Sequence, residues 1–245
     1  MIDNTTATPY LCRPFEWGAH IITHSTSKYI GGHGTSLGGV IVDSGKFNWA
    51  KSTRHTNFTT PDPSYHDVVY ADDFGPLAFI SKARAGIMRD IGATQSPFNS
   101  WLFIQGLETL SLRMERHSKN ALQIATALEK HPKISWLKYP FLQSHPQHGI
   151  AVRQMKNGGG IVCFELKGGL ESGKKFLNSL QMLSLTANLG DSRSIASHPA
   201  STTHGKLTEE ERLKVNITPG LIRISVGLEY ADDILNDIVQ ALEKS

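Results

Sequence analysis

The sequence predicts a mixed α/β protein, and three observations carry this prediction. Short apolar strands are expected at 19–24 and 40–42, where isoleucine, valine and threonine cluster. A long helix is expected to begin at Ser96, an N-cap residue followed by Pro97, and to stop before Pro132. Strand-like and helix-like segments then alternate as far as an amphipathic helix at the C-terminus.

The first two strands are expected to be antiparallel neighbours. The interval 25–39 is rich in glycine and shows no helical pattern, so it leaves no room for the crossover that parallel strands need. The next segment, 46–75, is aromatic, polar and irregular, with a turn-like sequence at 61–64. We expect it to form a long surface excursion that covers a site.

The long helix is expected to link two units and to bend near His117, because its apolar residues recur at three- to five-residue steps on either side. Further strands are expected at 134–137, 161–166 and 221–226, and a further helix at 174–180. Residues from about 125 onward are therefore expected to form a compact α+β domain.

The composition excludes several classes of function. The formal net charge is only +3, and no basic block marks a nucleic-acid or membrane surface. No apolar run approaches the ~20 residues of a membrane-spanning helix. Cys12 and Cys163 lie far apart, which argues against a disulfide framework or a cysteine zinc site. The first residues lack the features of a signal peptide, so the sequence predicts a cytoplasmic protein.

The segment Ser25–Gly34, directly after the first strand, holds the densest set of reactive side chains. Hydroxyls at Ser25 and Ser27 and the nearby glycines suit a phosphate group, because glycine allows a ligand to approach the backbone. Lys28 suits either a phosphate counter-ion or a covalent nucleophile toward a carbonyl group. The alternative is a solvated loop in which Lys28 faces water.

The same loop contains a pattern typical of hydrolases. Residues 34–38 fit the G-x-S-x-G nucleophile elbow, with Ser36 as the nucleophile, but that motif needs a helix after the serine. A strand is predicted there instead. No metal site is predicted either, because neither His20 with His24 nor His145 with His148 has a carboxylate at ligand spacing.

Arg223 is the outstanding charged residue of the C-terminal part. It lies between Ile222 and Ile224 in an apolar strand. An arginine in this setting either forms a structural ion pair or presents its fork to a substrate carboxylate, and the pattern alone leaves both readings open.

Four separated motifs resemble those of the Cys/Met-metabolism family of pyridoxal-phosphate (PLP) enzymes: residues 3–11, 24–34, 198–204 and 223–229. Within the family, residues 31–43 and the excursion around 58–66 most resemble the members that act as O-acetylhomoserine sulfhydrylases. The resemblance implies the fold of PLP-dependent transferases of fold type I (aspartate-aminotransferase-like) and a homo-oligomer, a dimer of dimers.

The resemblance also implies roles for individual residues in holding PLP. Lys28 corresponds to the lysine that forms the covalent link to the cofactor. Ser25 and Ser27 correspond to phosphate-binding hydroxyl positions. Asp3 corresponds to the carboxylate that pairs with the pyridine nitrogen and keeps it protonated, so that the ring can accept carbanion charge.

The implied substrates are small molecules. Arg223 corresponds to the residue that binds the substrate α-carboxylate, and Asn188 stands near it where relatives often have serine. The implied reaction replaces the acetyl group of O-acetyl-L-homoserine by sulfide or methanethiol. The alternatives are a cystathionine γ-synthase or a methionine or cystathionine γ-lyase of the same family, and a non-catalytic remnant that serves as an interaction module.

Family members are considerably longer than this chain, and their first motifs have no counterpart in it. We therefore expect a truncated chain with doubtful activity of its own. Residues 1–125 would be the C-terminal part of the PLP-binding domain, and residues 126–245 would be the small C-terminal α+β domain.

Overall fold

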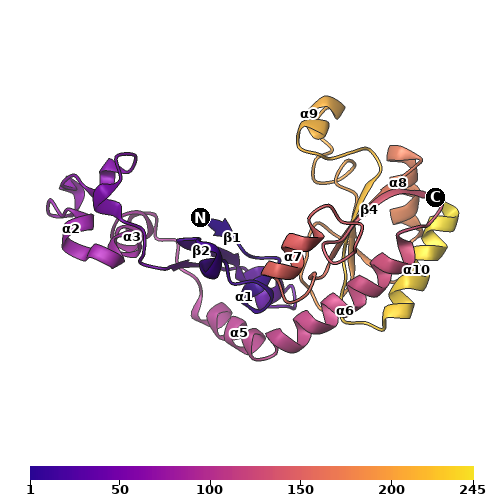
Figure 1. Ribbon diagram of the computed structural model, residues 1–245, viewed down its shortest axis with the longest axis horizontal. Coiled ribbons are helices and arrows are strands. Elements are labelled where there is room, and N and C mark those ends of the chain that lie inside the picture. The colour runs from indigo at the N-terminus through magenta and orange to yellow at the C-terminus, as the bar shows by residue number, and fades with distance from the viewer.

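A computed structural model describes residues 1–245 and contains two separate sheets. The molecule is elongated, with the N-terminal sheet near its middle and the C-terminal sheet toward one end (Figure 1). The strands are β1 (Ile2–Asp3), β2 (Ile21–Ser25), β3 (Gly39–Asp43), β4 (Ile134–Lys138), β5 (Ile161–Leu166), β6 (Ser184–Leu185), β7 (Ile195–Ser197) and β8 (Leu221–Ser225).

Ten α-helices accompany the sheets, and none combines the length and apolar character needed to cross a membrane. They are α1 (Thr8–Leu11), α2 (Tyr70–Phe74), α3 (Ala78–Lys82), α4 (Arg89–Ile91), α5 (Pro97–Glu108), α6 (Leu110–Leu128), α7 (His148–Gln154), α8 (Gly169–Ser179), α9 (Glu209–Lys214) and α10 (Ala231–Lys244). Short 3₁₀ turns lie at Pro14–Trp17, Trp49–Lys51, Thr56–Phe58, Pro63–Tyr65 and Gly75–Leu77, and π-helical turns at Thr26–Ile30 and Ala83–Met88.

The N-terminal sheet has the order β1-β2-β3. Strands β2 and β3 are antiparallel, with Ile22 opposite Val42, which confirms the predicted pairing. Strand β1 pairs with β2 in parallel, so Asp3 lies opposite Thr23. Strands β1 and β3 are both edge strands, and their outer sides have no partner in the chain.

The segment between β3 and α5 is an irregular series of short turns and helices, as expected, but it also has an apolar cluster of its own. Trp49 stacks on Phe58 with ring centroids 4.1 Å apart. The Lys82 amine lies 4.3 Å from the centroid of the Tyr70 ring and 2.9 Å from a carboxylate oxygen of Asp62. The excursion is therefore a small packed unit, at the far left of Figure 1, rather than a plain surface loop.

The predicted long helix is present but breaks in a different place. It divides at Thr109, where φ is −105° and ψ is 4°, into α5 and α6. The carbonyl of Gly106, in the last turn of α5, accepts a hydrogen bond from the Arg113 side chain at 2.6 Å. The prediction of a bend near His117 is wrong, because His117 is fully buried inside the continuous helix α6.

The C-terminal sheet has the order β4-β5-β8-β7-β6, and α6, α8 and α10 pack on it (Figure 1). Val162, Phe164, Ile222 and Ile224 are completely buried beneath these helices, and Phe164 meets Phe176 edge to face at 5.8 Å. The predicted strand at 161–166 and the C-terminal helix are confirmed. The helix predicted at 174–180 begins earlier, at the positive-φ residue Gly169.

Candidate active site

Lys28 lies in the π-helical turn Thr26–Ile30, which directly follows the buried strand β2. Its own dihedral angles, φ −95° and ψ −128°, depart from helical values and kink the turn. The Ser27 hydroxyl accepts a hydrogen bond from the Gly38 N–H at 2.9 Å and donates to the Gly38 carbonyl at 3.2 Å. The turn is therefore attached at one end to β2 and at its side to the start of β3.

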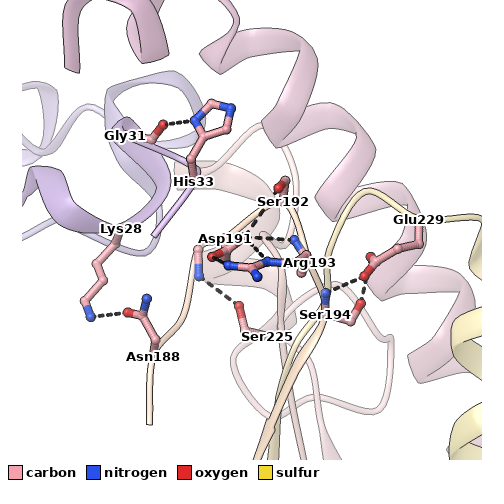
Figure 2. Close-up of polar contacts among 11 residues, drawn as sticks. Lys28, Gly31, His33, Asn188, Asp191, Ser192, Arg193, Ser194, Ser225 and Glu229 are labelled. Atoms are coloured by element: carbon pink, nitrogen blue, oxygen red, sulfur yellow. Dashed lines mark hydrogen bonds and ion pairs between the residues drawn. The ribbon is translucent and has the colours of Figure 1, made fainter. Parts of the chain in front are cut away.

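The Lys28 amine donates a hydrogen bond of 2.5 Å to the side-chain oxygen of Asn188 (Figure 2). Asn188 comes from the loop between β6 and β7, far away in sequence. The partner of the amine is thus a neutral amide, and no carboxylate holds it in an ion pair. An amine held in this way keeps its chemical reactivity better than one paired with a carboxylate.

Arg223 lies on β8 and reaches the same loop. Its Nη2 donates to the carbonyls of Ala187 and Asn188, at 3.3 and 3.2 Å. Its Nε is buried and has no hydrogen-bond partner, and no carboxylate lies within ion-pair distance of the guanidinium. The structure therefore contains no ion pair at Arg223, and Nη1, which makes no hydrogen bond within the chain, remains a donor for a ligand. Asn188 contacts Lys28 through its side chain and Arg223 through its backbone.

Asp3 lies at the carboxyl end of β1 and is connected to Ser25 through Thr5. One Asp3 oxygen accepts hydrogen bonds from the Thr5 hydroxyl at 2.5 Å and the Thr5 N–H at 2.9 Å. These bonds lower the pKa of Asp3 below its usual value. The Thr5 hydroxyl in turn accepts from the Ser25 N–H at 2.8 Å. Because β1 and β2 are parallel, Asp3 and Ser25, the last residues of these strands, lie at the same end of the sheet.

The loop from Asn188 to Ser194 is fixed against the Lys28 turn by its backbone. The Ser192 N–H donates to the Gly32 carbonyl at 2.9 Å, and the Gly190 N–H donates to the Ser225 hydroxyl at 2.9 Å. Gly190 has φ +75°, and a Cβ there would lie 2.6 Å from the Tyr29 nitrogen. Only glycine satisfies both the positive φ and this close approach. Figure 2 shows the loop running between the turn and the C-terminal sheet.

The sequence alone indicates no role for Asp191 and Arg193, which lie in the same loop. The Asp191 carboxylate is almost fully buried and pairs with Arg193 at 2.9 Å. Burial alone would raise the pKa of Asp191, but the hydrogen bonds from Arg193 and Ser192 and the charge of Arg193 together outweigh burial and lower it. Both residues line a cavity of about 230 Å³ together with Gly34 and Asn188. The cavity therefore adjoins the residue that contacts the Lys28 amine.

The structure excludes the nucleophile-elbow alternative. Ser36 lies in an irregular segment, and the strand β3 follows it instead of the helix that a hydrolase elbow requires.

The fold and these contacts define an α/β protein with a lysine-centred site at the edge of a sheet. The sequence model of the Cys/Met metabolism PLP-dependent enzyme family matches residues 1–243, so the chain belongs to that family. The cofactor of this family is pyridoxal 5'-phosphate.

Individual relatives agree with this membership. The chain is 51% identical to an O-acetyl-L-homoserine sulfhydrylase of Leptospira meyeri and 50% identical to a homocysteine synthase of Schizosaccharomyces pombe, in each case over 99% of this chain and 57% of the relative. The chain thus spans little more than half the length of these curated relatives.

A solved structure confirms the expected fold class. It belongs to a Campylobacter jejuni protein assigned as an O-acetylhomoserine (thiol)-lyase and contains N'-pyridoxyl-lysine-5'-monophosphate. The two structures superpose with a TM-score of 0.91 at 42% identity, over 98% of this chain and 58% of the other. The chain therefore has the fold of PLP-dependent transferases of fold type I.

Proposed function

We propose that this chain carries the lysine-bearing part of a PLP-dependent active site that converts O-acetyl-L-homoserine and sulfide or methanethiol into homocysteine or methionine, with release of acetate. The observation that carries the proposal is the meeting of the Lys28 amine and the Arg223 guanidinium at Asn188. The sulfhydrylase and homocysteine synthase named among the relatives support the choice of reaction.

The residues present fit pyridoxal 5'-phosphate. The Lys28 amine has no carboxylate partner and is available to the cofactor's aldehyde carbon. The low pKa of Asp3 keeps its carboxylate ionised, as a partner for a protonated ring nitrogen must be. Hydroxyls at Ser25 and Ser27 suit the phosphate, and the Thr26 hydroxyl beside them is buried without a partner. When bound, the cofactor supplies an electron sink for the charge that develops at Cα.

We assign the remaining roles from the chemistry of the side chains. Arg223, whose Nη1 makes no hydrogen bond within the chain, binds and orients the α-carboxylate of the amino-acid substrate. The Lys28 amine is placed to remove the Cα proton and to carry protons toward Cβ before acetate leaves from Cγ. Asn188 accepts a hydrogen bond from this amine and thereby holds it on the side of Arg223.

We also propose that the protein acts in the cytoplasm as a homo-oligomer, in which residues 1–125 contribute to the cofactor-binding domain and residues 126–245 form the small domain. Exposed apolar side chains on α5 support self-association, because Phe98, Trp101 and Ile104 are each more than half exposed.

The test is the variant Lys28→Ala, with Lys46→Ala as the matched control because Lys46 is exposed and lies outside the site. Both chains are mixed with PLP, the visible absorbance is recorded, and acetate release from O-acetylhomoserine is followed with sulfide. We expect Lys28→Ala to abolish both signals and Lys46→Ala to preserve them. Survival of both signals in Lys28→Ala would refute the assignment of the lysine.

The same assays separate the alternatives. Cystathionine formed when cysteine replaces sulfide would indicate a γ-synthase, and breakdown of methionine or cystathionine would indicate a γ-lyase. A folded wild-type chain that shows neither bound PLP nor turnover would contradict the enzymatic proposal and favour an interaction module, which co-purification with a longer homologue would support.

A further inference from the structure

Arg113, which belongs to none of the sequence motifs, binds the backbone of the Lys28 turn directly after the lysine. Arg113 lies on α6 and is only 6% exposed. Its Nη1 donates to the Tyr29 carbonyl at 2.6 Å, and its Nη2 donates to the Ile30 carbonyl at 3.1 Å and the Gly106 carbonyl at 2.6 Å. Its Nε donates to the Thr109 hydroxyl at 3.1 Å.

This burial is unusual for an arginine because it has no carboxylate partner. No Asp or Glu oxygen lies within ion-pair distance of the guanidinium. Only hydrogen bonds to neutral oxygens therefore offset the free energy lost when the charge is removed from water. Backbone carbonyls of two consecutive residues, Tyr29 and Ile30, satisfy two arms of the fork. A fork of fixed geometry determines the relative positions of the oxygens that it binds, which a lysine amine does not do.

Beyond the turn, the backbone also passes close to the guanidinium. Gly32 has φ +74°, and a Cβ at this position would lie 2.3 Å from Nη1 of Arg113. The turn that carries Lys28 and the glycine that follows it are therefore both shaped around this one side chain.

The same face of α6 reaches the strand that carries Arg223. His117, one helical turn beyond Arg113, donates from Nδ1 to the Val226 carbonyl at 2.6 Å. Asn120 donates to the Gly227 carbonyl at 3.1 Å. These carbonyls lie just after β8. Helix α6 thus holds the Lys28 turn at one point and the end of β8 about one turn further along, and Figure 1 shows it extending from the N-terminal sheet to the C-terminal one.

We propose that Arg113 is a positioning residue that fixes the Lys28 turn. It thereby keeps the lysine amine at a fixed position relative to Asn188 and, through α6, relative to Arg223. The proposal rests on the proposed function for the chemistry of the amine. Its geometric content, the position of the turn, is independent of that function.

The test compares Arg113→Met, which removes the fork but keeps an unbranched side chain, with Arg113→Lys, which keeps the charge without the fork. Arg116→Met is the matched control, because Arg116 lies on the same helix, is exposed and donates to the carbonyls of Leu228 and Glu229. Amide hydrogen exchange over residues 26–34 reports on the turn. The rate of Lys28 acetylation by an amine-reactive ester, relative to that of the exposed Lys46, reports on the amine.

We expect exchange in the turn to rise about tenfold or more in Arg113→Met, with a smaller rise in Arg113→Lys and none in Arg116→Met. Lys28 acetylation should rise in the same order, because the amine loses its fixed contact with Asn188. In the PLP-loaded protein, kcat should fall about tenfold or more while KM for the amino acid changes little, because Arg223 is untouched. The visible circular dichroism of the bound cofactor should change with it.

Two results would overturn the proposal: exchange in the turn and acetylation of Lys28 that are unchanged in a folded Arg113→Met, or exchange that rises equally over the whole chain. If Arg113→Met does not fold, Arg113→Lys decides in the same way, and uniform unfolding of both variants would assign Arg113 to general stability. A wild-type chain that binds no PLP would defeat the proposed function, but the exchange and acetylation measurements would still decide the role of Arg113.

Discussion

The two sheets of this protein are stabilised in different ways. The C-terminal sheet contributes to an apolar core of 21 buried residues, closed by three helices. The N-terminal sheet is bordered by clusters of only six and four buried residues, and Val40, Ile41 and Val42 of β3 remain 40–48% exposed. Lys28 lies in the turn that follows β2 of the less densely packed sheet, whereas Arg223 lies on β8 of the well-packed one.

This difference shows that the site depends on polar contacts more than on an apolar core. Lys28 is placed by hydrogen bonds from Arg113 to its turn, by the Ser27–Gly38 bonds and by its own bond to Asn188. Arg223 is placed by strand pairing within a buried sheet. The stability of the chain and the geometry of the site are therefore separable properties, which the following changes test.

The largest effect is expected in the C-terminal core. Phe164→Ala should lower the free energy of unfolding by about 3–5 kcal/mol, because the ring is completely buried against Phe176. Val42→Ala, in the N-terminal sheet, should cost less than about 1 kcal/mol, because that side chain is 40% exposed. Urea unfolding of both variants measures the contrast, and similar losses at the two positions would break the comparison.

A smaller effect is expected at the junction of the sheets, where burial lowers the pKa of His117 from 6.5 to about 4. Between pH 6.5 and pH 4 the unfolded chain binds a proton at His117 that the folded chain does not bind. The contribution of neutral His117 to the free energy of unfolding is therefore fully present above pH 6.5 and is lost as the pH decreases toward 4. The loss due to His117 should reach about 3 kcal/mol.

The variant His117→Asn isolates this contribution, because asparagine retains a donor for the Val226 carbonyl but does not titrate. Urea unfolding of both proteins at pH 7 and pH 5 measures it. We expect the wild-type protein to lose more stability than the variant over this interval, and equal losses would show that His117 is not the responsible histidine.

The smallest effect on stability is expected at the edge strand β3. Ile41→Lys should change the free energy of unfolding by no more than about 0.5 kcal/mol, because Ile41 is 48% exposed. It should also reduce self-association, because a charge on an edge strand opposes pairing with another chain. Sedimentation velocity measures the association. A stability loss well above this value would show that β3 is better packed than its exposure indicates.

Much of the fold could be predicted where residues repeat with a clear period. The strand at 161–166 alternates between buried and half-buried side chains, and the C-terminal helix carries apolar residues on one face. The short strand β7 and the helices α7 and α9 were not predicted, since segments of three to seven residues contain too few repeats to show a period. The break at Thr109 is not predictable from the sequence because neither proline nor glycine stands there; in the structure the Thr109 hydroxyl accepts a hydrogen bond from Nε of Arg113 at 3.1 Å.

The residues of the candidate site are harder to predict from the sequence than the fold is. The neighbours of Lys28 in the sequence mark it as a candidate, but only the resemblance to a family indicates Asn188, because a loop sequence does not show which distant side chain it will contact. Arg113 cannot be recognised from the sequence for a different reason. A charged residue in an amphipathic helix is normally assigned to the solvent face, and only the fold shows that its fork meets backbone carbonyls.

The bond between Lys28 and Asn188 joins residues 160 positions apart and so sets an order of events during synthesis. At about 5–20 residues per second, the ribosome adds Asn188 roughly 8 to 32 s after Lys28. The lysine turn leaves the ribosome well before its amide partner and the arginine strand exist. The nascent chain must therefore carry an exposed amine without these contacts until most of the C-terminal sheet has been made.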